Sequence, residues 1–226
     1  MTVYDTAKLL PSISALRDHC RALATLEAII RADDPFFRRY AFDARWSAAE
    51  ELATMSTGWG DEFSIVFSPA GAWIRGFDHF SPMSPYVDDA PWPGVVDEVP
   101  EDFRRYVEEP AFSDPDGFPV VTACLWRTTD DDTWRTGTID FPENDNDGDD
   151  PDGAAYLFQH LTDRSAEAYQ EFAVERHQVP VDLTAVRHVL ALRPLTTEVV
   201  TALRPDRTLA DLADDLATIG YPRAGH

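Results

Sequence analysis

Basic residues are scarce in this sequence, and lysine is nearly absent. The 226 residues include 19 Lys and Arg against 41 Asp and Glu, giving a formal net charge of -22 and a pI near 4.4. Lys8 is the only lysine. A surface of this sign repels nucleic acids and anionic membranes, so we expect neither as a partner. It suits a basic protein partner, and it also serves solubility alone, which is the commoner role of acidic surface residues.

Cysteines and long apolar runs are few as well. Cys20 and Cys124 both lie in apolar stretches, where they form either a disulfide or two buried thiols. We favour the thiols of a protein in a reducing cytosol. Residues 1–11 lack the charged start and apolar stretch of a signal peptide, and no apolar run approaches the length of a membrane span. The sequence therefore predicts a cytoplasmic protein.

The common catalytic and cofactor-binding motifs are also missing. No serine lies in a Gly-x-Ser-x-Gly elbow, and no His-Glu-x-x-His motif is present. The Gly-Trp-Gly segment at 58–60 joins two strand-like segments, whereas a phosphate-binding loop follows a strand and precedes a helix. We therefore expect no cofactor.

The hydrophobic pattern indicates one long helix followed by short strands. Apolar residues recur every three or four positions over 12–32, which predicts a helix. Four strand-like segments follow, at 36–46, 51–57, 63–68 and 72–77. Because short glycine-containing turns separate the later ones, we expect an antiparallel meander.

The second half begins with an irregular segment. Prolines punctuate residues 78–99, which predicts a long loop of the kind that often carries function. A short helix at 100–109 follows, and then two strands at 120–127 and 133–141 that form a hairpin. Five helices separated by prolines are predicted at 154–161, 166–177, 183–192, 197–203 and 209–219.

This order of elements predicts an α+β fold. Strands in one block and helices in another favour an antiparallel sheet of about six strands, with an N-terminal helix and a C-terminal helical layer. A doubly wound enzyme would alternate strands and helices, and this chain does not. We expect a single domain over 1–226, with the sheet in about 1–145 and the helical layer in about 150–222.

Asp78 and His79 are the candidate catalytic residues. They stand where a predicted strand ends and the long loop begins, and Asp88 and Asp89 lie further along that loop. A histidine with carboxylates can hold a metal ion or act as a general acid–base pair. A histidine that only anchors the loop by hydrogen bonds is the competing interpretation, and we favour it.

The acidic loop at 143–152 is a candidate cation site. Asp145, Asp147 and Asp149 alternate around a glycine, as the oxygen ligands of a calcium loop do. However, an EF-hand loop would need a glutamate where Ala154 stands, and Pro151 occupies another ligand position. A solvated turn is therefore the favoured interpretation.

Aromatic residues mark the candidate binding surface. Trp59 lies in a predicted turn, and Phe80, Tyr86 and Trp92 lie in the long loop. Exposed aromatic side chains are common anchors of protein interfaces. Three other tryptophans lie in predicted strands and are expected to be core residues: Trp73, Trp126 and Trp134.

Several short segments resemble a group of uncharacterised bacterial proteins. They are GDEF at 60–63, FSPAGA at 67–72, GFDH at 76–79, SPMSP at 81–85, FP at 141–142, DPDG at 150–153, and the ending from DL at 215–216 to GYP at 220–222. This resemblance covers most of the chain and implies no particular reaction. In size, acidity and fold class, the chain is also similar to the small acidic immunity proteins of bacterial toxin systems.

Two functions from different classes are compatible with these observations. The first, which we favour, is a protein-binding domain of the immunity type that captures and occludes a basic partner. The second is a small metal-assisted hydrolase with its site in the loop at 78–94. A domain that acts through a homodimer face is a third interpretation.

Overall fold

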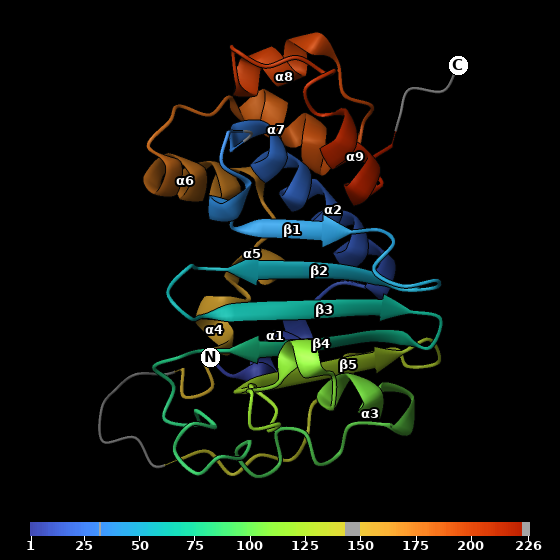
Figure 1. Ribbon diagram of the computed structural model, residues 1–226, viewed down its shortest axis with the longest axis vertical. Helices are drawn as coiled ribbons and strands as arrows, with labels where there is room; N and C mark the ends of the chain where they lie inside the picture. Colours follow the sequence, from blue (N-terminus) through green and yellow to red (C-terminus); the bar gives the residue numbers. More distant parts are fainter. Residues whose placement is uncertain (32, 143–149, 223–226) are drawn as a thin grey trace. The chain divides into compact units, whose positions relative to one another are not determined.

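The computed structural model describes residues 1–31, 33–142 and 150–222, and they form an α+β structure (Figure 1). Its antiparallel sheet has five strands that follow one another in chain order. The strands are β1 (Tyr40–Asp43), β2 (Glu51–Ser56), β3 (Glu62–Ser68), β4 (Gly71–Phe77) and β5 (Ala123–Thr128). The predicted fold class is therefore confirmed.

The chain divides into two compact units. The first comprises the described parts of segments 1–13 and 56–162, and the second those of segments 14–55 and 163–226. Strands β3, β4 and β5 belong to the first unit, and β1 and β2 belong almost entirely to the second.

In the first unit, strands β3 and β4 are covered on both faces. One face packs on α4 (Ala154–Leu157) and the residue after it, where the Phe63 ring lies 5.8 Å from that of Phe158. The other face packs on α3 (Glu101–Val107), with the rings of Trp73 and Tyr106 5.7 Å apart. Side chains alternate along a strand, so packing on both faces explains why every residue of β3 from Phe63 to Phe67 is buried.

Three short helical elements complete the first unit: α1 (Val3–Leu9), the 3-10 helix η2 (Pro110–Phe112) and α5 (Gln159–Thr162). Helix α1 was not predicted. It has only seven residues, and it begins with a capping box in which Thr2 and Asp5 satisfy each other's backbone N–H groups. Seven residues are too few to show a helical hydrophobic period.

The second unit is built around α2 (Ile13–Ile30). Every residue from Ala22 to Ile30 is buried, because other elements surround the end of this helix. The remaining elements of the unit are η1 (Pro35–Phe37), α6 (Ala166–His177), α7 (Leu183–Leu190), α8 (Thr197–Leu203) and α9 (Ala213–Ile219). The predicted long helix and the C-terminal helical layer are thus confirmed.

A buried carboxylate ties three parts of the second unit together. Glu27 on α2 has no exposed surface. Its Oε2 accepts a hydrogen bond from the backbone N–H of Arg39 at 2.7 Å, and its Oε1 accepts one from the Tyr169 hydroxyl at 3.0 Å. The Nε2 of His177 lies 2.9 Å from the same Oε1. A carboxylate can be buried only with such partners, so this network fixes α6 against α2.

The sixth predicted strand, at 133–141, is wrong. Only Arg135 pairs with β5, through a bridge to Trp126. The next residue bonds the β5 backbone with its side chain, because the Thr136 hydroxyl donates to the Cys124 carbonyl at 2.8 Å. At Gly137 the backbone passes so close to the Gly94 carbonyl that a Cβ there would lie 1.9 Å from its oxygen. Packing on the long loop therefore replaces strand pairing.

The first predicted strand is shorter than expected. Residues 35–37 form the 3-10 helix η1, so β1 begins only at Tyr40. The proline at the start of η1 has no N–H to donate to a sheet and is well suited to the first position of a helical turn.

Candidate functional site

Negative charge is concentrated in one unit. Segments 1–13 and 56–162 hold 24 acidic and 6 basic residues, a formal charge of -18. Segments 14–55 and 163–226 hold 17 acidic and 13 basic residues, a formal charge of -4. A charged partner would therefore be attracted mainly to the first unit.

Four large apolar side chains are exposed in two neighbouring segments of that unit. Trp59 is 80% exposed in the turn between β2 and β3. Phe80, Tyr86 and Val87 are 84%, 50% and 73% exposed in the loop after β4. We call these four residues the aromatic patch.

A buried aspartate joins the two segments. The Asp61 carboxylate is almost fully buried, and its Oδ1 accepts a hydrogen bond from the backbone N–H of His79 at 3.0 Å. Gly60 lies beside the same residue, since a Cβ on it would be 3.5 Å from the His79 Cβ. Trp59 and Phe80 are the next residues outward from this junction along each segment. The fold thus holds the two sides of the aromatic patch together.

Aromatic contacts support the patch from below. The buried Phe77 ring lies 5.7 Å from the Tyr86 ring and 6.3 Å from the His79 ring, edge to face in both cases. His79 in turn contacts Phe80 at 5.1 Å. Tyr86 also packs edge to face on Phe118 at 5.6 Å. These contacts position the exposed rings on a rigid base.

The part of the chain that carries Phe80, Tyr86 and Val87 is acidic. No Lys or Arg occurs between Arg75 and Arg104, while this stretch contains seven acidic residues. Of these seven residues, Asp78 lies next to the contact between Asp61 and His79. Its burial, and after it the negative charges of Asp61 and Asp150, raise the pKa of this carboxyl above its ordinary value. The patch therefore combines apolar rings with an acidic surrounding.

A pocket of about 430 Å³ opens beside the patch and shares Tyr86 with it. We call it the Tyr86 pocket. Aromatic rings, two carboxylates and one arginine line it, namely Phe77, Tyr86, Phe112, Glu62, Asp114 and Arg75. Arg75 is buried, forms an ion pair with Glu62 and stacks over the Phe112 ring at 5.0 Å. Because Arg75 neutralises Glu62, the Asp114 carboxylate leaves the pocket with one net negative charge.

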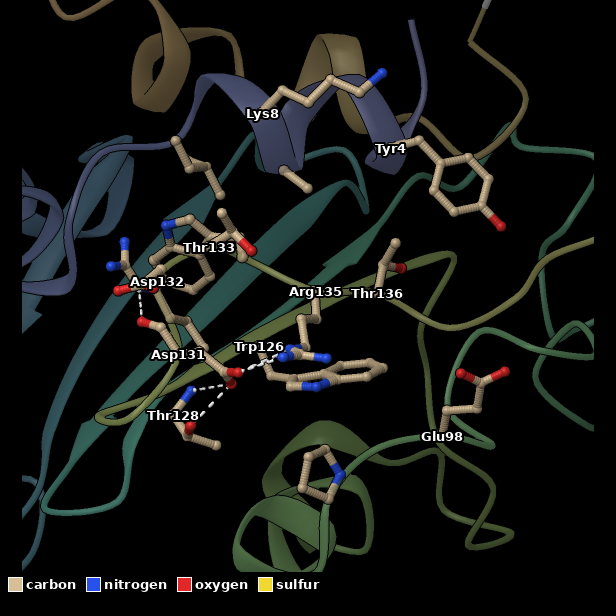
Figure 2. A pocket seen from close by; sticks show the side chains of 15 residues that line it. Tyr4, Lys8, Glu98, Trp126, Thr128, Asp131, Asp132, Thr133, Arg135 and Thr136 are labelled. Atoms are coloured by element: carbon tan, nitrogen blue, oxygen red, sulfur yellow. Dashed lines mark hydrogen bonds and ion pairs between the residues drawn. The ribbon is translucent and has the colours of Figure 1, made fainter.

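A larger hollow of about 940 Å³ has a different character (Figure 2). Figure 2 shows Tyr4 and Lys8 on α1 at one side, Glu98 at the opposite side, and Trp126 beside Arg135 between them. The hollow is lined by three basic residues, Lys8, Arg127 and Arg135, and by three acidic ones, Glu98, Asp131 and Asp132. Arg135 is already paired with Asp131 at 2.7 Å. Because basic and acidic lining residues are equal in number, the hollow favours neither an anionic nor a cationic ligand.

Comparisons with protein-family models, with curated proteins and with solved structures found no match for this chain. In the part of the chain that the structure describes, no helix is both long enough and apolar enough to span a membrane.

The side chains of the predicted catalytic residues Asp78 and His79 have different partners in the structure. The Asp78 carboxylate accepts a hydrogen bond from the Phe80 backbone N–H at 2.9 Å, so it caps the turn that follows β4. Among the described residues, no hydrogen bond joins it to the His79 ring. Asp88 and Asp89 are exposed in the loop. Residues 1–31, 33–142 and 150–222 contain no group of three His, Cys, Asp or Glu side chains that could hold a metal ion.

The other predicted site residues differ in exposure, and some lie outside the described residues. Trp59, Phe80 and Tyr86 are exposed on the two segments of the aromatic patch. Trp92 is partly buried, and its Nε1 donates to the Asp140 carbonyl at 2.9 Å, so its indole anchors the loop to Asp140. The candidate calcium ligands Asp145, Asp147 and Asp149 lie outside the described residues.

Sequence reasoning missed Asp61 and Asp114. Asp61 stands directly after the Gly-Trp-Gly turn, and an aspartate there often bonds neighbouring backbone, so a signal for a structural role existed. Asp114 follows α3 and is brought to Tyr86 only by the folded chain. No local pattern points to that proximity.

Proposed function

We propose that this chain is a cytoplasmic protein-binding domain that captures a basic protein partner through the aromatic patch. The observation that carries the proposal is the position of the patch. Four exposed apolar residues lie on two segments that are joined at the Asp61–His79 contact, in the unit whose segments, 1–13 and 56–162, hold a formal charge of -18. The free, buried state of Cys20 and Cys124 agrees with a reducing compartment.

Exposed apolar side chains are normally scattered over a protein surface, and a contiguous group often marks an interaction site. Trp and Tyr are enriched among the interface residues that contribute most to binding. The rings of Tyr86 and Phe80 also pack on Phe77 and His79, so these two side chains would lose little conformational freedom when a partner binds. These features support direct protein contact as the role of the patch.

The acidic surrounding supports a basic partner. Complementary charge raises the rate of encounter and disfavours partners of the same sign. The same charge repels the phosphates of nucleic acids. An immunity-type role, in which the patch covers the working surface of a basic toxin, follows as the specific form of this proposal.

The test is affinity capture of partners from an extract of the organism that carries this chain, at low and at moderate salt. Phe80→Ala and Trp59→Ala remove two rings of the patch. The matched control is Phe36→Ala, because Phe36 is 89% exposed but lies in η1 of the second unit. Mass spectrometry identifies what co-purifies.

We expect one basic protein in stoichiometric amount, lost with Phe80→Ala and Trp59→Ala, retained with Phe36→Ala and weakened by salt. Retention of the same protein by all three variants would contradict the proposal. Light scattering on the pure protein separates a heterologous partner from the homodimer alternative, since a patch-dependent dimer would place a second copy on the same surface.

A further inference from the structure

We propose that the Tyr86 pocket receives an arginine side chain of the basic partner. This inference rests on the proposed function and specifies the group that the partner presents. It follows from the position of the pocket, from its charge and from the kind of side chains that line it.

The pocket adjoins the surface where a partner would bind. Tyr86 belongs both to the aromatic patch and to the pocket wall, and His79 also lines the pocket while contacting Phe80. A side chain from a protein seated on the patch could therefore enter without any movement of the loop. The volume of about 430 Å³ lies within the range of roughly 300–1,000 Å³ found for pockets that enclose small molecules.

The charge of the pocket calls for one cation. Arg75 forms an ion pair with Glu62 and bonds the Val120 carbonyl, so both charges of that pair are already matched. Asp114 has no cation of its own among the described residues. Its own turn holds it in place, because its Oδ1 accepts from the Asp116 N–H at 2.8 Å. A guanidinium beside Asp114 would leave the lining neutral.

The walls suit a planar cation. Phe77, Tyr86 and Phe112 offer aromatic rings, on which guanidinium groups stack more readily than ammonium groups do. The pocket already contains one such contact, in which Arg75 stacks over Phe112. Burial, and then the neighbouring Asp114 carboxylate with its hydrogen bond, raise the pKa of the Tyr86 hydroxyl. The Asp114 carboxylate, which takes part in this hydrogen bond, has further lone pairs for a second donor.

The experiment is an NMR titration of the full chain, labelled with nitrogen-15, using the peptide acetyl-Gly-Arg-Gly-amide. The control peptide replaces arginine by citrulline, which has nearly the same shape and no charge. We expect saturable shifts of the Gly60, Ser113 and Asp114 amide signals with the arginine peptide. With the citrulline peptide we expect binding at least about fivefold weaker, as for loss of a partly exposed ion pair with a cation–π contact.

Asp114→Asn should weaken binding of the arginine peptide by a similar factor. The matched control is Asp116→Asn, since Asp116 is exposed in the same turn but does not line the pocket. Equal shifts with both peptides, or no shift at these amides, would overturn the inference. The peptide comparison uses the unaltered chain, so it stands even if a variant fails to fold.

Failure of this inference is distinguishable from failure of the proposed function. Phe80 and Trp59 do not line the pocket, so their variants leave the peptide titration unchanged while they abolish partner capture. Capture that depends on Phe80, together with a negative titration, would remove the arginine pocket and keep the binding domain. Capture that is independent of Phe80 would overturn the proposed function whatever the titration shows.

Discussion

At the scale of single residues, buried carboxylates organise this protein. Glu27, Asp61 and Asp152 all lie in the interior, and each accepts hydrogen bonds from backbone N–H groups. An unpartnered buried carboxylate would be costly, so each position depends on the backbone that surrounds it. Substitutions at these residues should therefore affect stability more than substitutions of surface acids.

Asp152 should make stability depend on pH. Burial raises the pKa of this carboxyl from 3.8 to about 6, against the opposing effect of the hydrogen bonds from Val3 and Ala154. A group whose pKa is raised in the folded state stabilises the fold while protonated, and this contribution is lost as the pH rises through about 6. Asp152→Asn removes the titration.

Urea unfolding of the unaltered protein and of Asp152→Asn, at pH 5 and at pH 8, measures this effect. Both pH values lie above the pI near 4.4. We expect the stability of the unaltered protein, relative to Asp152→Asn, to fall by about 1–2 kcal/mol between these pH values. The repulsion between surface charges changes with pH in the same way in both proteins, so it cancels in the difference between their unfolding free energies. A relative stability that stays constant or rises with pH would show that Asp152 is charged in the fold at pH 5.

Glu27→Gln should destabilise the second unit. The NH2 group of glutamine donates hydrogen bonds and cannot accept them, so at least one of the partners Arg39, Tyr169 and His177 would lose its acceptor. We expect a loss of about 1–3 kcal/mol in the free energy of unfolding. Glu171→Gln on the exposed face of α6 is the control and should change it by less than about 0.5 kcal/mol. Equal effects in urea unfolding would contradict the network.

At the scale of elements, tight turns hold the sheet together. Gly71 begins β4 with φ of +142°, and a Cβ there would lie 2.1 Å from the Arg127 carbonyl oxygen of β5. Gly117 also has a positive φ, but a Cβ on it would meet no atom within 4 Å. At both positions an alanine would be strained by the positive φ. Only at Gly71 would its Cβ also collide with neighbouring backbone.

Gly71→Ala should therefore be worse than Gly117→Ala. We expect it to lower the free energy of unfolding by about 1–3 kcal/mol more than the control does, because the β5 backbone must move. Thermal or urea unfolding of the two variants gives the comparison. Similar losses for both would mean that β4 and β5 are less closely paired than their register indicates.

Helices with clear caps could be predicted from the sequence alone. The predicted bounds of α6 and α8 agree with the structure, and Ser165 and Thr196 cap them with side-chain hydrogen bonds. The segment at 133–141 alternates like a strand, yet its backbone packs on the long loop at Gly94. Such a contact joins positions distant in sequence, and no local pattern encodes it.

At the scale of the whole molecule, the uneven charge was not visible before the fold was known. The net charge of -22 follows from composition, but its concentration in the first unit depends on which segments fold together. The exposed rings of Trp59, Phe80 and Tyr86 were predicted because turns and loops expose aromatic residues. Trp92, predicted by the same argument, is partly buried and donates a hydrogen bond to the Asp140 carbonyl.

The most direct test of the central claim is the dissociation constant of the captured basic partner, measured at two salt concentrations with the unaltered chain and with Phe80→Ala and Phe36→Ala. The account predicts binding that weakens with salt, that weakens by at least about thirtyfold with Phe80→Ala, as for a central interface anchor, and that is unchanged with Phe36→Ala. Binding that is indifferent to Phe80, or lost equally with Phe36→Ala, would contradict it.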